Sequence, residues 1–219
     1  PRMRPVITLL AASLIAAPFA SQAADTRLQA LFDSAWEADL RDNPIAADYL
    51  GDHRYSAHWP DLSPAAFAAR HARYEATLAQ LKAISRAALS GGDQLNYDLF
   101  AQDFQRRLDA QPFKPWLYEA IRPRDGVQTS SELAELLPFA TVGDYEAWIA
   151  RLGKMGTYID QNIALLQTAI REKRTQPRSI MERIPAQLAK QIPDSAEDSP
   201  FFEPFKRFPD SIGAEDRAR

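Results

Sequence analysis

Apolar residues recur every three or four positions through most of this chain, and this spacing constrains its fold more than any other feature. The first such run lies between residues 28 and 40, and the longest lies between 145 and 170. Residues three and four apart share one face of a helix, so each run predicts a helix with a single apolar stripe. The sequence therefore predicts an all-α protein, built as a multi-helix array or bundle.

Short polar side chains before these runs predict where the helices begin, because their oxygens accept hydrogen bonds from the free N–H groups of a first turn. The predicted caps are Asp25 or Thr26, Asn43 before Pro44, Ser63, Asp93, Thr129 with Glu132, Thr141 with Asp144, and Ser211. Gly51 is expected to close a short helix in the left-handed conformation. The run from 145 to 170 predicts one long helix, in which Gly153 and Gly156 permit close helix contact or a bend.

Proline predicts two interruptions of this helical pattern. Between 111 and 128 the spacing fails, and prolines alternate with Trp116 and Tyr118, so we expect an ordered irregular segment. Pro185 lies inside the apolar run that follows Pro177, and it predicts a kink because proline removes one helical hydrogen bond.

The first 23 residues have the pattern of a secretory signal peptide. Arg2 and Arg4 precede an apolar run over 6–20, and Ser21-Gln22-Ala23 supplies small residues at a cleavage site. The run is shorter than the roughly 20 residues that a spanning helix needs. We therefore expect cleavage after Ala23, a helical domain over 24–219, and a periplasmic or secreted location. A capped helix that would begin at Ser211 and stop at Arg219 predicts that this domain is truncated at its C-terminal end.

Composition excludes several classes of function. The chain has 29 acidic and 26 basic residues, for a formal net charge of −3. This balance argues against a nucleic-acid partner and against attraction to an anionic membrane once the signal is removed. The sequence contains no cysteine, which excludes a disulfide, a thiolate zinc site, a cysteine nucleophile and a lipid anchor on an N-terminal cysteine.

A search for chemistry identifies no catalytic, cofactor-binding or metal-ligating residue in this chain. The zinc-peptidase motif H-E-x-x-H and the nucleophile motif G-x-S-x-G are both absent from the sequence. His53 and His58 lie in a loop with Asp52 and Asp61, which indicates either a metal site or, as we favour, a solvated polar loop.

Two further groups of residues have a structural and a functional interpretation. His71 and Glu75 are four apart on one predicted helix, where a surface ion pair is the favoured interpretation over a metal site. Four phenylalanines lie close together near the C-terminal end, and they indicate a core, with a partner-docking patch as the alternative: Phe201, Phe202, Phe205 and Phe208.

An ordered series of segments resembles the N-terminal part of the bacterial "domain of unknown function 885" family, and it covers nearly all of the chain after residue 23. The segments are Asn43-Pro44-Ile45-Ala46-Ala47-Asp48-Tyr49-Leu50-Gly51-Asp52-His53-Arg54-Tyr55, Leu95-Asn96-Tyr97-Asp98-Leu99, Pro138–Tyr145, Trp148–Leu152, Tyr158–Gln161, Ser199–Phe202 and Phe208-Pro209.

This resemblance implies an exported, largely helical protein more than twice as long, similar to zinc metallopeptidases of the gluzincin type. In such proteins H-E-x-x-H and a downstream glutamate lie in the C-terminal part, and no position here matches them. The resemblance therefore implies a scaffold that is inactive alone and that packs against a missing catalytic part, with zinc and peptides expected only for the full-length parent. The alternative is a non-catalytic periplasmic helical binding or interaction module.

Overall fold

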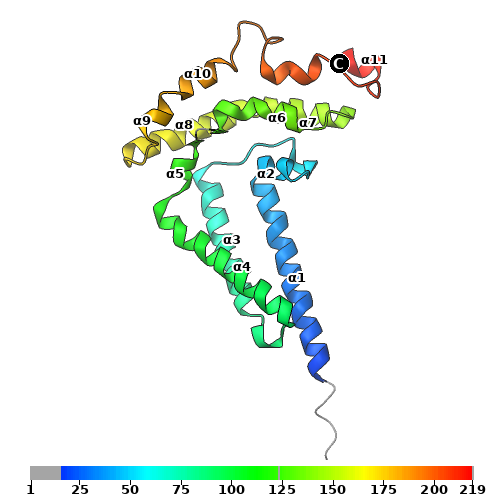
Figure 1. Cartoon of the computed structure of the whole chain (residues 1–219), viewed down its shortest axis with the longest axis vertical. Helices are drawn as coiled ribbons and strands as arrows, with labels where there is room; N and C mark the ends of the chain where they lie inside the picture. Colours follow the sequence, from blue (N-terminus) through cyan, green and yellow to red (C-terminus); the bar gives the residue numbers. More distant parts are fainter. Residues whose placement is uncertain (1–15, 123, 219) are drawn as a thin grey trace, which may run out of the picture. The chain divides into compact units, whose positions relative to one another are not determined.

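The computed structural model describes residues 16–122 and 124–218, and over these residues it confirms the predicted all-α fold. Residues 1–15 of the predicted signal peptide lie outside the described residues. In chain order (Figure 1) the α-helices are α1 (Ala16–Asp42), α2 (Pro44–Tyr49), α3 (Pro64–Lys82), α4 (Gly91–Ala110), α5 (Trp116–Glu119), α6 (Leu133–Leu136), α7 (Val142–Gly153), α8 (Met155–Arg171), α9 (Arg178–Met181), α10 (Ile184–Ala189) and α11 (Ala214–Ala218).

Shorter elements connect these helices. The 3-10 helices are η1 (His53–Tyr55), η2 (Arg86–Ala88), η3 (Gln111–Phe113), η4 (Val127–Glu132) and η5 (Pro200–Phe205). Two short antiparallel strands, β1 (Ile121–Arg122) and β2 (Asp125–Gly126), pair Ile121 with Gly126 and Arg122 with Asp125. Gly126 has φ +131, and a Cβ there would lie 2.7 Å from Gln128 Oε1, so this turn requires glycine.

Two compact units divide the chain. Unit 1 contains the described residues through Ala35 together with Ala72–Leu108, and unit 2 contains Trp36–His71 and the described residues from Asp109 onward. The predicted domain boundaries, a signal over 1–23 and a helical domain over 24–219, stay predictions.

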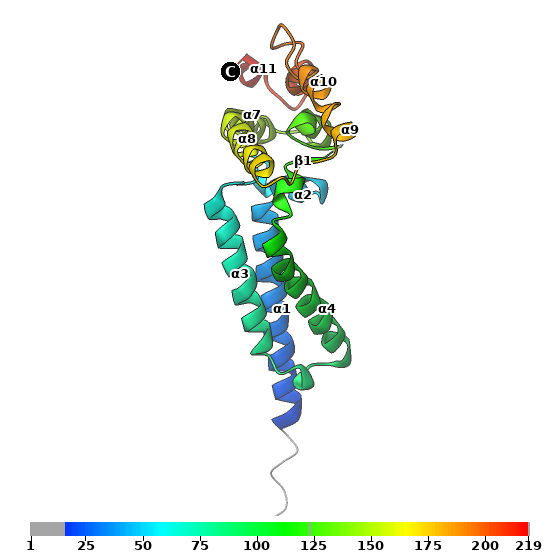
Figure 2. The ribbon, with the colours of Figure 1, turned by 90° about the vertical axis from the view of Figure 1, so that its left-hand side faces the viewer.

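Unit 1 is built from the parts of α1, α3 and α4 that lie side by side in Figures 1 and 2. Their apolar stripes meet in one core, as the three-and-four spacing predicts. The buried residues of this core are Leu28, Leu31, Ala35, Leu78, Leu81, Ile84, Leu89 and Phe104.

Unit 2 has two apolar clusters that both involve α8. In one, Trp59 and Tyr158 pack with residues of α6 and α7. In the other, Leu117 and Ala120 pack against α8 residues Leu165 and Ala169. These clusters contain more aromatic side chains than the core of unit 1, and Trp59 of the first cluster contacts the polar centre described below.

The predicted helix starts are confirmed where the capping hydrogen bond joins residues that are close in sequence. Asn43 Oδ1 accepts from Ala46 N at 3.1 Å, Ser63 Oγ accepts from Ala66 N at 3.1 Å, and Thr141 forms a capping box with Asp144. Gly51 has φ +81, as predicted.

Four predicted caps are wrong. Asp25 and Thr26 lie inside α1, which already includes the alanine-rich stretch from Ala16, and Asp25 accepts instead from Ser90 N. Ser90 Oγ, not Asp93, accepts at the start of α4. The segment from Thr129 to Glu132 forms part of a 3-10 helix, and Ser211 donates to Ala140 O while α11 begins at Ala214.

The prediction of one long helix from 145 to 170 is also wrong, because α7 ends at Gly153 and α8 begins at Met155. The carbonyl of Arg151 accepts a tight-turn bond from Lys154 N at 3.0 Å and a second bond from the Trp59 indole at 2.8 Å. Both bonds occupy the carbonyl that a regular helix would offer to Met155 N. A side chain from a distant loop therefore interrupts the helix.

The proline-rich segment that begins at residue 111 is ordered, as predicted, whereas the predicted kink at Pro185 is a full break. Residues 111–122 form η3, α5 and β1, and Trp116 stacks on Phe67 with ring centroids 4.8 Å apart. Pro185 lies in the first turn of α10, so it separates α9 from α10 and does not merely kink one helix. Over the described residues, each helix is too short or too polar to cross a bilayer.

Candidate functional site

Two charged residues lie on buried helix faces that are otherwise apolar, and the two charges meet in unit 2. Helix α2 buries Pro44, Ala47 and Asp48, which share one face at spacings of three and four. Helix α7 buries Tyr145, Trp148 and Arg151 in the same way. The side chains of Asp48 and Arg151 both have zero exposure, which is rare for charged groups unless they are paired.

The pair forms a buried ion pair at short range. Arg151 Nη1 lies 2.7 Å from Asp48 Oδ2, although the two groups lack the alignment of a hydrogen bond. The other carboxylate oxygen, Oδ1, accepts from Ser56 Oγ and lies 3.3 Å from His53 Nδ1. Asp48 thus contacts residues at both ends of η1 while it compensates the charge of Arg151.

An aromatic ring lies against the guanidinium, and a second ring stacks on the first. The Arg151 Cζ atom lies 5.3 Å from the centre of the Trp59 ring, and Trp59 stacks on Tyr158 with centroids 4.6 Å apart and planes within 9°. The Trp59 ring therefore contacts both the guanidinium and the Tyr158 ring. We call Asp48, Ser56, Trp59 and Arg151 the Asp48–Arg151 centre.

Burial lowers the pKa of Arg151, and the nearby Asp48 carboxylate opposes this shift. Arginine nonetheless stays protonated in proteins, so the centre retains a charged guanidinium. With no exposure to solvent, neither charge can contact a dissolved substrate. The chemistry that the arrangement supports is electrostatic attachment of the loop after α2 to α7.

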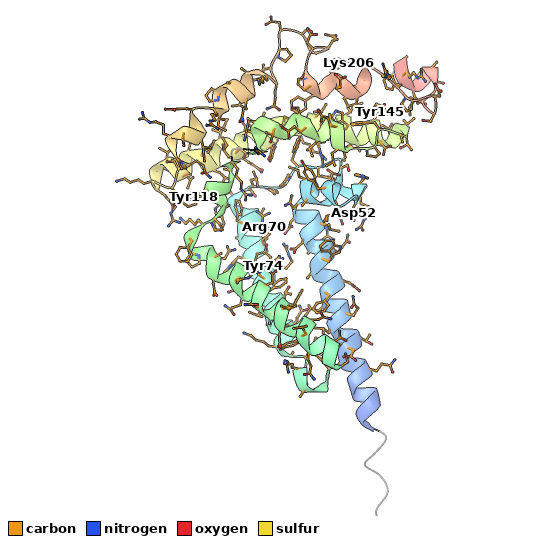
Figure 3. The ribbon with its side chains drawn as sticks, in the orientation of Figure 1. Asp52, Arg70, Tyr74, Tyr118, Tyr145 and Lys206 are labelled. Atoms are coloured by element: carbon orange, nitrogen blue, oxygen red, sulfur yellow. The ribbon has the colours of Figure 1, made fainter. Side chains whose placement is uncertain are left out.

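A partly exposed ionic network lies next to this centre on the same loop, where Figure 3 labels Asp52. Arg54 Nη2 lies 2.9 Å from Glu37 Oε2 and 2.6 Å from Asp52 Oδ2, and the Tyr55 hydroxyl donates to Glu37. Hydrogen bonds from Arg54 lower the pKa of both carboxyl groups, and the Glu37 carboxylate raises the pKa of Tyr55. Because Arg54 is exposed and the two carboxylates remain partly accessible to solvent, the network contributes less to stability than the buried pair.

The four loop residues considered for a metal site have separate partners. His53 contacts Asp48, His58 Nδ1 lies 3.2 Å from Lys154 Nζ, and Asp52 pairs with Arg54. Asp61 accepts from Ser63 N at 2.8 Å and from Gln161 Nε2 at 2.9 Å. Over residues 16–122 and 124–218, no group of three or more histidine, cysteine, aspartate or glutamate side chains has the placement to hold a metal ion.

The four phenylalanines are half-buried and pack against the aromatic cluster of unit 2, which agrees only in part with the core interpretation. Phe205 and Phe208 contact the Tyr145 ring at centroid distances of 5.7 and 5.0 Å, and Figure 3 shows Tyr145 on α7 facing this segment. Phe201 O accepts from the Trp148 indole at 3.1 Å. The ion pair between His71 and Glu75 stays a prediction.

Asp48 and Arg151 both lie in the segments that resemble the family, but the sequence does not identify them as partners. The available signal was the position of each charge on an apolar stripe, three residues after Trp148 for Arg151 and four after Pro44 for Asp48. Such a position predicts a buried charge that needs a partner. Sequence spacing gave no indication of which partner it would be.

The fold and this centre define an all-α protein in which a buried ion pair joins segments that are distant in sequence. Residues 44–219, which include both charges, match the family described as "Bacterial protein of unknown function (DUF885)", and the chain belongs to that family. No curated protein and no solved structure is significantly similar to the chain. Family membership predicted from the sequence is thus confirmed, whereas export and the metallopeptidase-like activity stay predictions.

Proposed function

We propose that this chain is a helical scaffold region of an exported protein whose family resembles zinc metallopeptidases. The full-length parent protein hydrolyses peptides, and the part of it outside this chain binds zinc and supplies the catalytic groups. The chain described here positions that part and hydrolyses nothing by itself.

The Asp48–Arg151 centre is the observation that supports this role. Its charges have zero exposure and contact each other, a loop and an aromatic stack, so they are suited to holding elements in place. Separating the two charges would leave each one buried without compensation, which is strongly unfavourable. The pair therefore holds the helices that contain it in one arrangement, as a scaffold requires. The centre lies within the family match, which supports a role shared by the parent protein.

The experiment compares this chain with the full-length product of its gene. Zinc content is measured by mass spectrometry of the metal, and cleavage is measured on a fluorogenic peptide library with and without a chelator. We expect zinc and chelator-sensitive cleavage for the full-length protein and neither for this chain. Cleavage by this chain alone would contradict the scaffold role, and a full-length protein without zinc or cleavage would favour the non-catalytic binding module.

Export is tested on the same expressed protein. We expect the periplasmic fraction to contain a chain that begins at Ala24, which mass determination of the intact protein detects. Replacing Ala23 with a bulky residue should retain the uncleaved form, because the cleavage site requires small residues. An uncleaved wild-type chain found only in the cytoplasm would refute export.

A further inference from the structure

Helix α8 has a second apolar stripe that faces solvent. Its buried face contains Tyr158, Asn162, Leu165 and Ala169. One position further along, Ile159, Ile163 and Ile170 are 36%, 47% and 66% exposed, and Leu166 between them is half-buried. A contiguous exposed row of large aliphatic side chains is unusual for a surface that contacts only water.

The spacing of this stripe reads the same in both directions. Successive members of the row at 159, 163, 166 and 170 are four, three and four residues apart. An antiparallel copy of α8 therefore places Ile159 opposite Ile170 of the other copy and Ile163 opposite Leu166. This self-complementarity is what a two-fold symmetric interface requires.

Charges beside the stripe favour the same arrangement. Asp160 and Arg171 are exposed and each follows a stripe isoleucine by one residue, so both lie on the same flank. A two-fold axis through the middle of the stripe brings Asp160 of each copy next to Arg171 of the other copy, so the dimer contains two such pairs. A parallel two-fold arrangement would place this flank of the two copies on opposite sides of the interface, so neither ion pair could form. Arg171 Nη2 donates to Thr168 Oγ1 at 2.8 Å, which leaves its other donors for such a pair.

We propose that α8 mediates a symmetric homodimer in which the stripe formed by Ile159, Ile163, Leu166 and Ile170 packs against its antiparallel copy. Paired contacts between Asp160 and Arg171 fix the direction. The contact lies entirely within unit 2 and does not depend on the proposed scaffold role.

Sedimentation velocity of the whole chain over a concentration series tests this inference. We expect a monomer–dimer equilibrium for the wild type and only monomer for Ile163→Glu, because the substitution places a charge at the centre of the apolar contact. Ile149→Glu is the matched control: Ile149 is 55% exposed on α7, outside the stripe, and its variant should still dimerise. Circular dichroism should show that both variants keep their helix content.

A charge exchange tests the antiparallel direction. Asp160→Arg and Arg171→Asp should each weaken the dimer, roughly tenfold in dissociation constant, and the double variant should recover it. A wild-type chain that stays monomeric at its highest soluble concentration would overturn the proposal and assign the stripe to a different partner. A double variant weaker than both single variants would equally overturn the antiparallel arrangement.

Discussion

The cores of the two units use different means to hold their helices. Unit 1 packs aliphatic side chains and phenylalanine, and Thr77 is the one buried polar residue among its described residues. Unit 2 buries Asp48, Ser56, Gln128, Ser130, Arg151 and Asn162 beside its aromatic clusters. Apolar packing stabilises helices but tolerates shifts between them, whereas a buried charge has few partners that can compensate it. We infer that the polar centre of unit 2 fixes which segments meet.

The stabilities of the two units can be measured separately because all four tryptophans belong to unit 2: Trp36, Trp59, Trp116 and Trp148. Tryptophan fluorescence therefore reports the unfolding of unit 2, whereas far-ultraviolet circular dichroism reports helix loss in both units. Chemical denaturation followed by both signals separates an effect on one core from an effect on the other.

The largest effect is expected from Arg151→Met. The variant leaves Asp48 buried without a compensating charge, which should cost roughly 3–5 kcal/mol of unfolding free energy. The fluorescence transition in urea should move to lower denaturant. Arg178→Met is the matched control, since the Arg178 side chain is 90% exposed in the same unit and its variant should unfold like the wild type. Equal behaviour of the two variants would refute a special role for Arg151.

In unit 1, Leu81→Ala should cost roughly 2–5 kcal/mol, because Leu81 is fully buried and its truncation leaves a cavity. Circular dichroism should detect helix loss at lower denaturant than tryptophan fluorescence does. Leu95→Ala, at a position 60% exposed on α4, should change neither transition appreciably. A shift confined to fluorescence would show that the two cores do not unfold as described.

A smaller effect is expected at the start of α7. Thr141→Ala removes the capping box with Asp144, and such caps contribute about 1 kcal/mol. Thr141→Ser keeps the hydroxyl and should retain most of the stability. Denaturation of the two variants measured by fluorescence decides whether the cap acts through this oxygen.

The smallest effect concerns pH and His58. Burial, then the charges of Lys154 and Arg151, lower the pKa of His58 from its ordinary value of 6.5. The unfolded chain therefore binds the proton more readily, so unit 2 should lose stability as pH falls below about 6.5. His58→Gln should flatten this dependence in fluorescence-detected denaturation from pH 7.5 to 5.5. An unchanged slope would mean that the lost stability comes from other groups.

Sequence reasoning predicted well those features of the fold that depend on neighbouring residues. The helical runs follow from apolar spacing, and the caps at Asn43, Ser63 and Thr141 follow from contacts three residues away. The break between α7 and α8 was missed because the Trp59 indole, far away in sequence, binds the Arg151 carbonyl. Asp25 was misassigned for a similar reason, since its partner is the distant Ser90.

The candidate site could be predicted only in part. The resemblance to the family identified the segments that contain Asp48 and Arg151, but that each charge lies on a buried helix face is known only from the structure. Which charge compensates which depends on how α2 and α7 pack, and helical periodicity does not determine that packing. The same limit explains why His53 and His58, close in sequence, have different partners.

The most direct test of the central claim is a double-mutant cycle on the buried pair. Unfolding free energies are measured by tryptophan fluorescence for Asp48→Leu, Arg151→Met and the double variant. If the pair fixes the geometry of unit 2, each single variant loses roughly 3–5 kcal/mol and the double variant loses far less than the sum. Losses that add within about 0.5 kcal/mol would show that the two charges act independently and would contradict the account.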